Sequence, residues 1–260
     1  MLIDTHTHLY VEQFAEDRAE VINRAIEKGI NRFYLPNIDS EHIEDLLALE
    51  AAYPEHCFAM MGLHPCSVKE NYEEELAIIE QWLKKRPFVA IGEIGLDLYW
   101  DKTFFEQQKT AFRQQIRWAK QLELPIVIHS RESTWEVIEI LRTEYDENLR
   151  GIFHCFGGNV EEANAITDLG FYLGIGGVLT FKKAKLDETL KKIDLQHIVL
   201  ETDSPYLAPT PYRGKRNESS YIRIIAEKLA EVKDVSLEEI AAITSENASN
   251  IFMPKVVKTT

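Results

Sequence analysis

The chain is predicted to fold as an α/β protein, a single (β/α)8 barrel (TIM barrel). Eight short apolar segments rich in β-branched and aromatic residues alternate with longer charged segments of helical periodicity, and this alternation is typical of parallel sheets built from βαβ units. The length of 260 residues suits one barrel of about 250 residues. Because no linker divides the chain, the barrel is expected to span 1–254 and residues 255–260 to form a tail.

The expected strands are short apolar runs. They are, in order, LIDTHTH (2–8), RFYLPNI (32–38), CFAMMGLHP (57–65), FVAIGEIGLD (88–97), PIVIHS (125–130), GIFHCF (151–156), FYLGIGGV (171–178) and HIVLETDSP (197–205). A doubly wound sheet is the alternative, but such sheets usually have fewer strands. The count therefore favours a closed barrel.

The expected helices follow the strands. They cover 16–28, 41–52, 73–85, 104–121, 133–146, 160–169 and 185–193, and two more close the chain at 219–233 and 236–249. Ser236 and Glu239 have the spacing of a capping box at the start of the last helix. Each strand is thus followed by a helix, as the barrel requires.

Composition excludes several classes of function. The formal net charge of −14 argues against a broad basic surface for duplex nucleic acid, because such binding depends on lysine and arginine opposite phosphates. The three cysteines show no CxxC spacing and suit a reducing compartment. No apolar run approaches the roughly 20 residues of a membrane span, and the first residues lack the apolar stretch of a signal peptide. We expect a cytoplasmic protein without membrane contact or an obligate protein partner.

The first predicted strand carries an HxH pair, His6 and His8. Alternate residues of a strand face one side, so Leu2, Asp4, His6 and His8 are expected to share a face. If that face looks into the barrel, both imidazoles stand at the carboxyl end of the strand, where barrel active sites are built. A lone HxH pair is weak evidence, since single histidines are more often satisfied polar residues.

Other strands end in the same way. The polar residues at their carboxyl ends are His64, Glu93, His129, His154 and Asp203. Imidazole and carboxylate groups together bind zinc, manganese, iron or nickel, and magnesium with more retained water. The pattern predicts a divalent-metal site at the carboxyl ends of the strands. The remaining histidines are assigned to structure: His42 in a helix, His56 in a loop and His197 at the opposite end of the last strand.

The predicted ligand set is large enough for two ions. One ion can be held by His6, His8, Glu93 and Asp203 and the other by Glu93, His129 and His154, with Glu93 bridging. Paired ions about 3.5–4 Å apart can generate a nucleophilic hydroxide and stabilise the attacking and leaving oxygens. Two acidic ligands cancel only about half of the four positive charges, so the site suits an anionic substrate such as a phosphate.

Three residues are predicted to be catalytic. Glu93 bridges the ions, Asp203 can take the proton of the attacking water, and His64 either binds metal or hydrogen-bonds the substrate. Asp4 and Glu201 lie one alternation deeper on the first and last strands. Carboxylates at such positions orient ligating histidines, although a purely structural pair of buried acids is the alternative.

Basic residues near the strand ends are candidate substrate contacts. Arg213, Lys215 and Arg216 follow the last strand, where barrels frequently bind phosphate, and Arg131 lies two residues after His129. A guanidinium group matches phosphate oxygens in a bidentate manner. The alternative for each residue is a solvated basic turn.

Three aromatic residues are candidates for stacking on bases. They are Phe181, Tyr206 and Tyr212, and aromatic side chains of this kind often stack on the bases of single-stranded nucleic acid. Simple packing is the alternative for each of them.

Seven motifs along the chain resemble the TatD family of metal-dependent deoxyribonucleases, within the wider amidohydrolase-like barrels. They are IDTHTHL, GLHP, GEIGLD, IVIHSR, FHCFGG, GIGGVLTFK and ETDSPYLAP followed by RGKRNE. The resemblance implies a (β/α)8 barrel, a two-metal centre, and hydrolysis of phosphodiester bonds in DNA, often from the 3′ end. The family's ligands carry over onto His6, His8, Glu93, His129, His154 and Asp203.

The chain departs from the family pattern at two positions. Ser219 stands where the family usually has proline after RNE, and Gly157 where serine is common. Neither change removes a ligand. Family members are usually magnesium-dependent, whereas a histidine-rich site physically favours zinc or manganese, so the ion stays open among Mg²⁺, Mn²⁺ and Zn²⁺.

The leading hypothesis is therefore a metal-dependent hydrolase of DNA phosphodiester bonds, a 3′ to 5′ exonuclease on single-stranded ends. An amidohydrolase acting on a cyclic amide or lactone is the second hypothesis, since fold alone does not decide function. The basic loop argues against it, as does Glu93, which stands where many such enzymes carry a modified lysine. A non-catalytic metal-binding protein is the third, and the intact set of costly clustered polar groups disfavours it.

Overall fold

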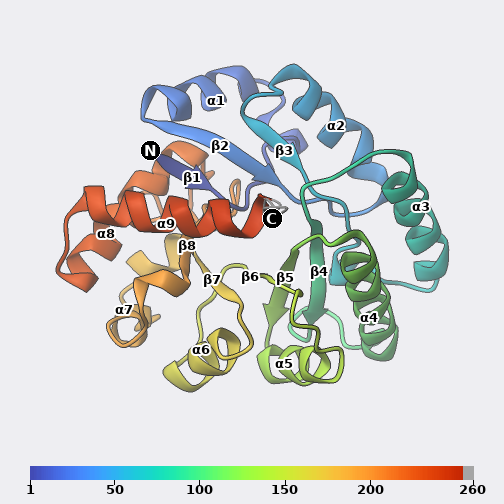
Figure 1. The fold of residues 1–260 in the computed structure, drawn as a ribbon. Helices are drawn as coiled ribbons and strands as arrows, with labels where there is room; N and C mark the ends of the chain where they lie inside the picture. The colour runs from blue at the N-terminus through green and yellow to red at the C-terminus, as the bar shows by residue number, and fades with distance from the viewer. Residues whose placement is uncertain (254–260) are drawn as a thin grey trace, which may run out of the picture.

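A computed structural model describes residues 1–253 of the chain. Within these residues, eight parallel strands alternate with helices in the order that the sequence predicts (Figure 1). The strands are β1 (Leu2–Asp4), β2 (Ile30–Leu35), β3 (Cys57–Ala59), β4 (Ile91–Asp97), β5 (Ile126–Arg131), β6 (Gly151–Phe153), β7 (Tyr172–Ile175) and β8 (Ile198–Leu200). The predicted boundary between barrel and tail, at 254–255, lies outside the described residues.

The strands form two parallel sheets, β1-β2-β3 and β4-β5-β6-β7-β8. Backbone hydrogen bonds join the sheets at both seams. At one seam Met61 N–H donates to Ala90 C=O over 3.1 Å, and at the other Thr5 N–H donates to Leu200 C=O over 3.1 Å. The (β/α)8 barrel prediction is confirmed.

The helices surround the strands (Figure 1). They are α1 (Arg18–Glu27), α2 (Ile43–Ala52), α3 (Tyr72–Lys85), α4 (Phe105–Leu122), α5 (Thr134–Thr143), α6 (Val160–Thr167), α7 (Leu186–Leu190), α8 (Ile222–Lys233) and α9 (Leu237–Phe252). Local capping starts two of them: Asn159 and Glu162 form a complete capping box at α6, and the Ser236 hydroxyl accepts from Glu239 N–H at α9. No described helix is long and apolar enough to cross a membrane.

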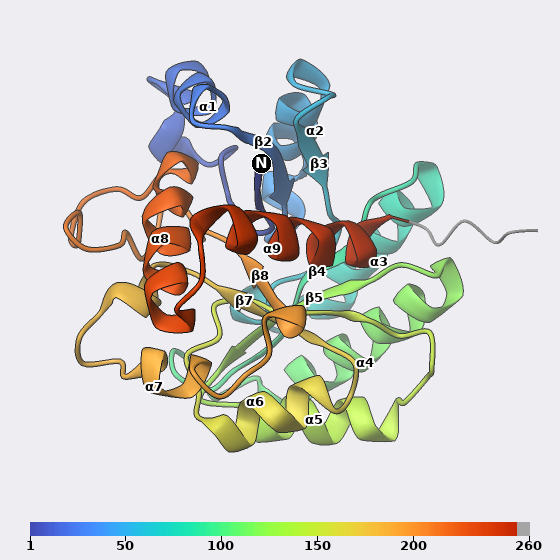
Figure 2. The same cartoon turned by 60° about the vertical axis from the view of Figure 1, so that its left-hand side comes forward.

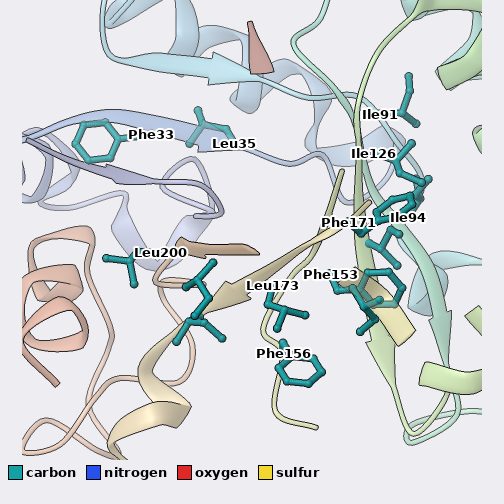
Figure 3. Close-up of a cluster of buried hydrophobic side chains, with 14 of the residues drawn as sticks. Phe33, Leu35, Ile91, Ile94, Ile126, Phe153, Phe156, Phe171, Leu173 and Leu200 are labelled. Carbon is teal, nitrogen blue, oxygen red and sulfur yellow. The ribbon is translucent and has the colours of Figure 1, made fainter. Parts of the chain in front are cut away.

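Apolar side chains fill the space between the strands and the surrounding helices. Figure 3 shows part of this layer, including Phe33, Ile94, Phe153 and Leu200, all of them buried. Burial of such side chains is the main stabilising contribution to the fold. The strands are thereby held as a rigid frame for the side chains at their ends.

A second buried layer lies at the amino-terminal end of the strands, where α9 covers them. Ala248, Ile251 and Phe252 of α9 belong to the same cluster as Ile3 and other strand residues. Asn247 donates to the carbonyls of Leu195, just before β8, and of Ile198, the first residue of β8. Figure 2 shows α9 running across this side of the strands. With the amino-terminal end closed in this way, the carboxyl-terminal end is left for function.

The predicted strand 2–8 is shorter in the structure, and this corrects one inference. β1 ends at Asp4, Leu2 packs toward the helices, and Ile3 lies in the inner layer. Beyond Asp4 the backbone leaves the ladder, because Thr7 N–H donates to Tyr34 C=O and His8 N–H to Ser204 C=O. Strand alternation therefore does not place residues 2, 4, 6 and 8 on one face; an irregular segment carries the two histidines.

Candidate metal centre

The carboxyl ends of the strands bring together all seven residues predicted to be metal ligands or catalytic groups. Two come from within strands, Glu93 in β4 and His129 in β5, and five come from the segments just beyond strand ends: His6, His8, His64, His154 and Asp203. Three overlapping groups within this cluster have ligand atoms close enough to share an ion: His6, His8 and Asp203; His6, Glu93 and His154; and His64, Glu93 and His129.

One carboxylate oxygen of Glu93 faces the histidines that follow β1. Its Oε2 lies 3.1 Å from His6 Nε2 and 3.5 Å from His8 Nε2. Asp203 Oδ1 approaches the same two nitrogens, at 3.8 Å and 3.6 Å. These four residues are the set that the sequence predicts for the first ion.

The other oxygen of Glu93 faces the histidines of the neighbouring strands. Its Oε1 lies 2.9 Å from His129 Nδ1, 3.0 Å from His154 Nε2 and 3.2 Å from His64 Nε2. Glu93 thus presents one oxygen to each half of the cluster, which is the geometry of a bridging ligand. The His6 and His154 rings stack between the halves with centroids 3.8 Å apart.

Hydrogen bonds on the outer side of the rings select which nitrogen is free to bind a cation. Tyr10 donates its hydroxyl proton to Pro36 C=O over 2.6 Å, so its oxygen accepts from His8 Nδ1 at 3.1 Å. In the neutral ring the proton therefore sits on Nδ1, and Nε2 presents a lone pair to the cluster. His8 is prepared as a ligand.

His129 is oriented by a carboxylate that sequence reasoning did not single out. Asp97 Oδ2 lies 2.8 Å from His129 Nε2, so this nitrogen carries the proton and Nδ1 is free to face Glu93. Histidine ligands commonly donate their second N–H to a carboxylate. The signal was available in GEIGLD, where residues 93 and 97 occupy alternate positions of one strand.

His64 has the opposite arrangement. Cys66 N–H donates to His64 Nδ1 over 3.0 Å, so Nδ1 holds the lone pair. Burial lowers the pKa of His64, which keeps the ring neutral with its proton on Nε2. This nitrogen faces Glu93 and the cavity as a hydrogen-bond donor, an arrangement that favours substrate contact over metal ligation.

The predicted supporting acids behave differently from each other. Glu201 Oε1 lies 3.4 Å from His154 Nδ1 and accepts from Cys155 N–H at 2.6 Å, so it flanks a ligand ring as expected. Asp4 instead accepts from the backbone N–H and the hydroxyl of Thr202, at 2.9 Å and 2.6 Å. Burial raises the pKa of Asp4 to about 7. Asp4 joins the ends of β1 and β8 rather than orienting an imidazole.

The electrostatics of the cluster fit a bound divalent cation. Glu93 is 2% exposed and Asp203 9%. Burial acts to raise the pKa of Glu93, yet the surrounding imidazoles, His154 foremost, hold it well below its usual range. Burial likewise opposes protonation of His154, but Glu93 raises its pKa well above the usual value. Buried carboxylates thus depend on nearby positive charge, which a cation at these nitrogen and oxygen donors would supply while displacing protons.

A cavity of about 750 Å³ opens over the cluster. Its lining includes three of the four predicted basic contacts, Arg131, Arg213 and Lys215, and two of the predicted aromatic residues, Phe181 and Tyr206. The third aromatic residue, Tyr212, stacks on Tyr221 with ring centroids 4.3 Å apart.

The structure does not bring Arg216 to this cavity. Its guanidinium group forms two hydrogen bonds with the Asp17 carboxylate, at 2.8 Å and 2.6 Å, and a third with Gln13 C=O. Arg216 therefore fixes the loop after β8 to the segment before α1, and it lowers the pKa of Asp17. Its charge is already paired, so we leave Arg216 out of the phosphate-binding set.

Comparisons with known proteins identify relatives of this chain. A sequence model described as TatD related DNase matches residues 3–253. The uncharacterized metal-dependent hydrolase YabD of Bacillus subtilis is 44% identical and the alignment covers 97% of this chain and 99% of that protein. The uncharacterized metal-dependent hydrolase YcfH of Escherichia coli K12 is 32% identical, and the alignment covers 96% of this chain and 95% of that protein.

A solved structure is similar along the whole chain. The crystal structure of YjjV, a TatD homolog from Escherichia coli K12, has a TM-score of 0.92 and 30% identity, and the match covers 97% of this chain and 98% of that one. The fold, the ligand cluster and the sequence relatives therefore lead to one assignment. The chain belongs to the TatD family of metal-dependent hydrolases.

Proposed function

We propose that the protein is a deoxyribonuclease that hydrolyses phosphodiester bonds at single-stranded DNA ends, in the 3′ to 5′ direction. One observation carries the proposal: Glu93 presents an oxygen to each of two sets of ligand atoms, beneath a cavity whose rim holds Arg131, Arg213 and Lys215. A binuclear centre under a basic rim suits an anionic phosphodiester. The family described by the matching sequence model is a DNase family.

We assign two divalent ions, magnesium, manganese or zinc, to this centre. One would be held by His6, His8, Glu93 and Asp203, and the other by Glu93, His129 and His154. When bound, such ions supply a nucleophile at neutral pH and stabilise charge on the phosphoryl oxygens. The nitrogen-rich donor set favours zinc or manganese over magnesium.

The protein's own groups orient the substrate and move the proton. Burial acts to raise the pKa of Asp203, but the contact with His8 and the other imidazoles lowers it, so Asp203 is a carboxylate able to accept a proton from the attacking water. His64 donates from Nε2 to a phosphate oxygen. Arg213 and Lys215, at the edge of the cavity, bind the phosphates farther along the strand.

We place the protein in the cytoplasm. Cys57, Cys66 and Cys155 are all free thiols. Free thiols of this kind are typical of reducing compartments.

Digestion of end-labelled DNA tests the proposed activity and its direction. Metal-loaded protein is incubated with one single-stranded oligonucleotide labelled at either the 5′ or the 3′ end, and with the matching blunt duplex. We expect a 5′-labelled strand to give a ladder of progressively shorter products, a 3′-labelled strand to release labelled mononucleotide at once, and the duplex to react more slowly. A protein that cleaves lactones or cyclic amides and no oligonucleotide would contradict the proposal.

The His64 variant separates substrate contact from metal binding. His64→Ala is expected to retain two ions per chain while kcat/KM for the oligonucleotide falls about 10- to 100-fold, the scale of losing a charged hydrogen bond in a catalytic site. Metal is measured by mass spectrometry on the purified protein. His197→Ala, at the far end of β8, is the matched control and should leave both quantities unchanged. Loss of one ion from His64→Ala would show that it is a ligand.

Arg213 is expected to act on long substrates. Arg213→Ala should raise KM for an oligonucleotide about tenfold, because one phosphate contact is lost, and change KM for a small phosphodiester little. Steady-state kinetics at two salt concentrations measure the KM values for both substrates. Arg223→Ala on α8, whose partner is Glu227, serves as the control. Equal effects of Arg213→Ala on both substrates would remove Arg213 from recognition of the strand.

A further inference from the structure

An exposed aromatic pair stands at the mouth of the cavity, immediately after β4. Trp100 is 68% exposed and Tyr99 is 48% exposed, and their rings meet edge to face with centroids 4.9 Å apart. Trp100 also lines the cavity that contains Glu93. A large indole left in water contributes little to folding, and exposed aromatic surface next to a site is typical of a contact for a ligand.

The position of this pair is fixed relative to the metal centre. Asp97 Oδ1 accepts the backbone N–H groups of both Tyr99 and Trp100 at 2.9 Å, while Asp97 Oδ2 holds His129 at 2.8 Å. One buried carboxylate therefore connects the aromatic pair to a ligand ring. The backbone that carries the indole is therefore held at a fixed place beside the candidate ligands.

A positive charge accompanies the aromatic surface. The Arg131 guanidinium carbon lies 3.9 Å from the centroid of Tyr99 and 5.4 Å from that of Trp100, and within residues 1–253 Arg131 forms no ion pair. Elsewhere on the cavity wall, the guanidinium carbon of Arg213 lies 4.2 Å from the ring centroid of Phe181. In a chain of net charge −14, aromatic faces beside the guanidinium groups of Arg131 and Arg213 fit a ligand that carries both flat rings and phosphates.

We propose that Trp100 is a stacking platform for an unpaired base of the substrate strand, and that Arg131 binds the phosphate next to that base. The inference rests on the proposed nuclease function and adds to it the residues that distinguish unpaired from paired ends. A base within a duplex is stacked on its neighbours and hydrogen-bonded to its partner, so it reaches Trp100 only after unpairing. A frayed or single-stranded end has no such cost, and any base can stack because every base has a π-face.

The test compares loss of the indole with loss of the base. Trp100→Ala, Trp100→Phe and the control Trp135→Ala, whose indole is 38% exposed on α5, are prepared as metal-loaded proteins. Binding is measured by fluorescence anisotropy with a phosphorothioate-linked strand that resists hydrolysis. A second strand has the same backbone, but its three terminal residues at each end are abasic.

We expect Trp100→Ala to weaken binding of the ordinary strand about tenfold, the effect of removing one base–aromatic stack, and to leave binding of the abasic strand unchanged. The affinity of Trp100→Phe for the ordinary strand should lie between those of wild type and Trp100→Ala. The affinity of Trp135→Ala should match that of wild type. If Trp100→Ala weakens binding of both strands equally, or of neither, Trp100 is not a stacking platform.

Hydrolysis of the ordinary phosphodiester strand separates this inference from the function on which it rests. If wild type digests the strand and Trp100→Ala does so with the same KM, the platform is wrong and the nuclease function stands. If binding depends on both Trp100 and the base but no metal supports digestion, the platform stands and the nuclease function is wrong. Absence of both binding and digestion would overturn both.

Discussion

Substituting glutamine for Glu93 is expected to abolish hydrolysis and to remove bound metal. Glu93 is the residue on which the cluster converges: one oxygen lies 3.1 Å from His6 and the other 2.9 Å from His129. Glutamine has nearly the same shape but no charge, and one of its two terminal atoms is a donor. It cannot bridge two cations, and its N–H group would donate a hydrogen bond to the lone pair of an imidazole nitrogen that faces it.

The expected loss is large because Glu93 serves both halves of the site. We expect kcat to fall about 10³-fold or more, the scale seen when a central catalytic group is removed, and metal content to fall below one ion per chain. Both are measured on the same sample, with the circular dichroism melting curve as a check on folding. His197→Ala is again the control. Normal turnover by Glu93→Gln would refute the bridging role.

Asparagine in place of Asp97 is expected to weaken the metal centre although Asp97 is outside the predicted ligand set. Asp97 Oδ1 accepts two backbone N–H groups, from Tyr99 and Trp100. An asparagine must therefore keep its carbonyl oxygen toward the backbone and turn its amide N–H₂ toward His129 Nε2. The His129 ring then has to accept at Nε2 and carry its proton on Nδ1, the nitrogen that faces Glu93 at 2.9 Å.

The exchange of tautomer removes a metal ligand without removing a side chain. We expect Asp97→Asn to lower metal affinity or kcat about 10- to 100-fold, the usual effect of losing a carboxylate behind a ligating histidine. Calorimetric titration of stripped protein and steady-state kinetics measure the two quantities. Asp101→Asn is the matched control, because Asp101 pairs with Lys69 on the exposed surface. An unchanged affinity and rate in Asp97→Asn would show that the orientation of His129 does not depend on this carboxylate.

Much of the fold could be read from the sequence because strand and helix periodicities differ and the chain is locally consistent. The order of the eight strands is as predicted, and the residues at their carboxyl ends meet at one end of the barrel. This follows from parallel topology alone, since every parallel strand ends on the same side. The ligand cluster could therefore be proposed before any contact was known.

Other features depend on contacts between distant residues and could not be predicted. Strand alternation failed beyond Asp4, where Thr7 N–H bonds to Tyr34 in β2 and His8 N–H bonds to Ser204 beyond the end of β8. The sequence predicts Arg216 as a substrate contact because nothing local shows that Asp17, 199 residues away, pairs with its charge. The proton positions on His8 and His64 depend on a hydroxyl and a backbone N–H whose directions the sequence does not contain.

We propose that this cluster is a two-ion centre that hydrolyses phosphodiester bonds. The most direct test strips the protein with a chelator, adds back Mg²⁺, Mn²⁺ or Zn²⁺ in steps, and follows ions bound per chain and hydrolysis of an end-labelled single strand in the same samples. Asp203→Asn runs alongside. We predict no hydrolysis by the stripped protein, full activity near two bound ions, and little activity of Asp203→Asn at any loading. Full activity of the stripped protein, or no activity at two ions per chain, would contradict a two-ion hydrolytic centre.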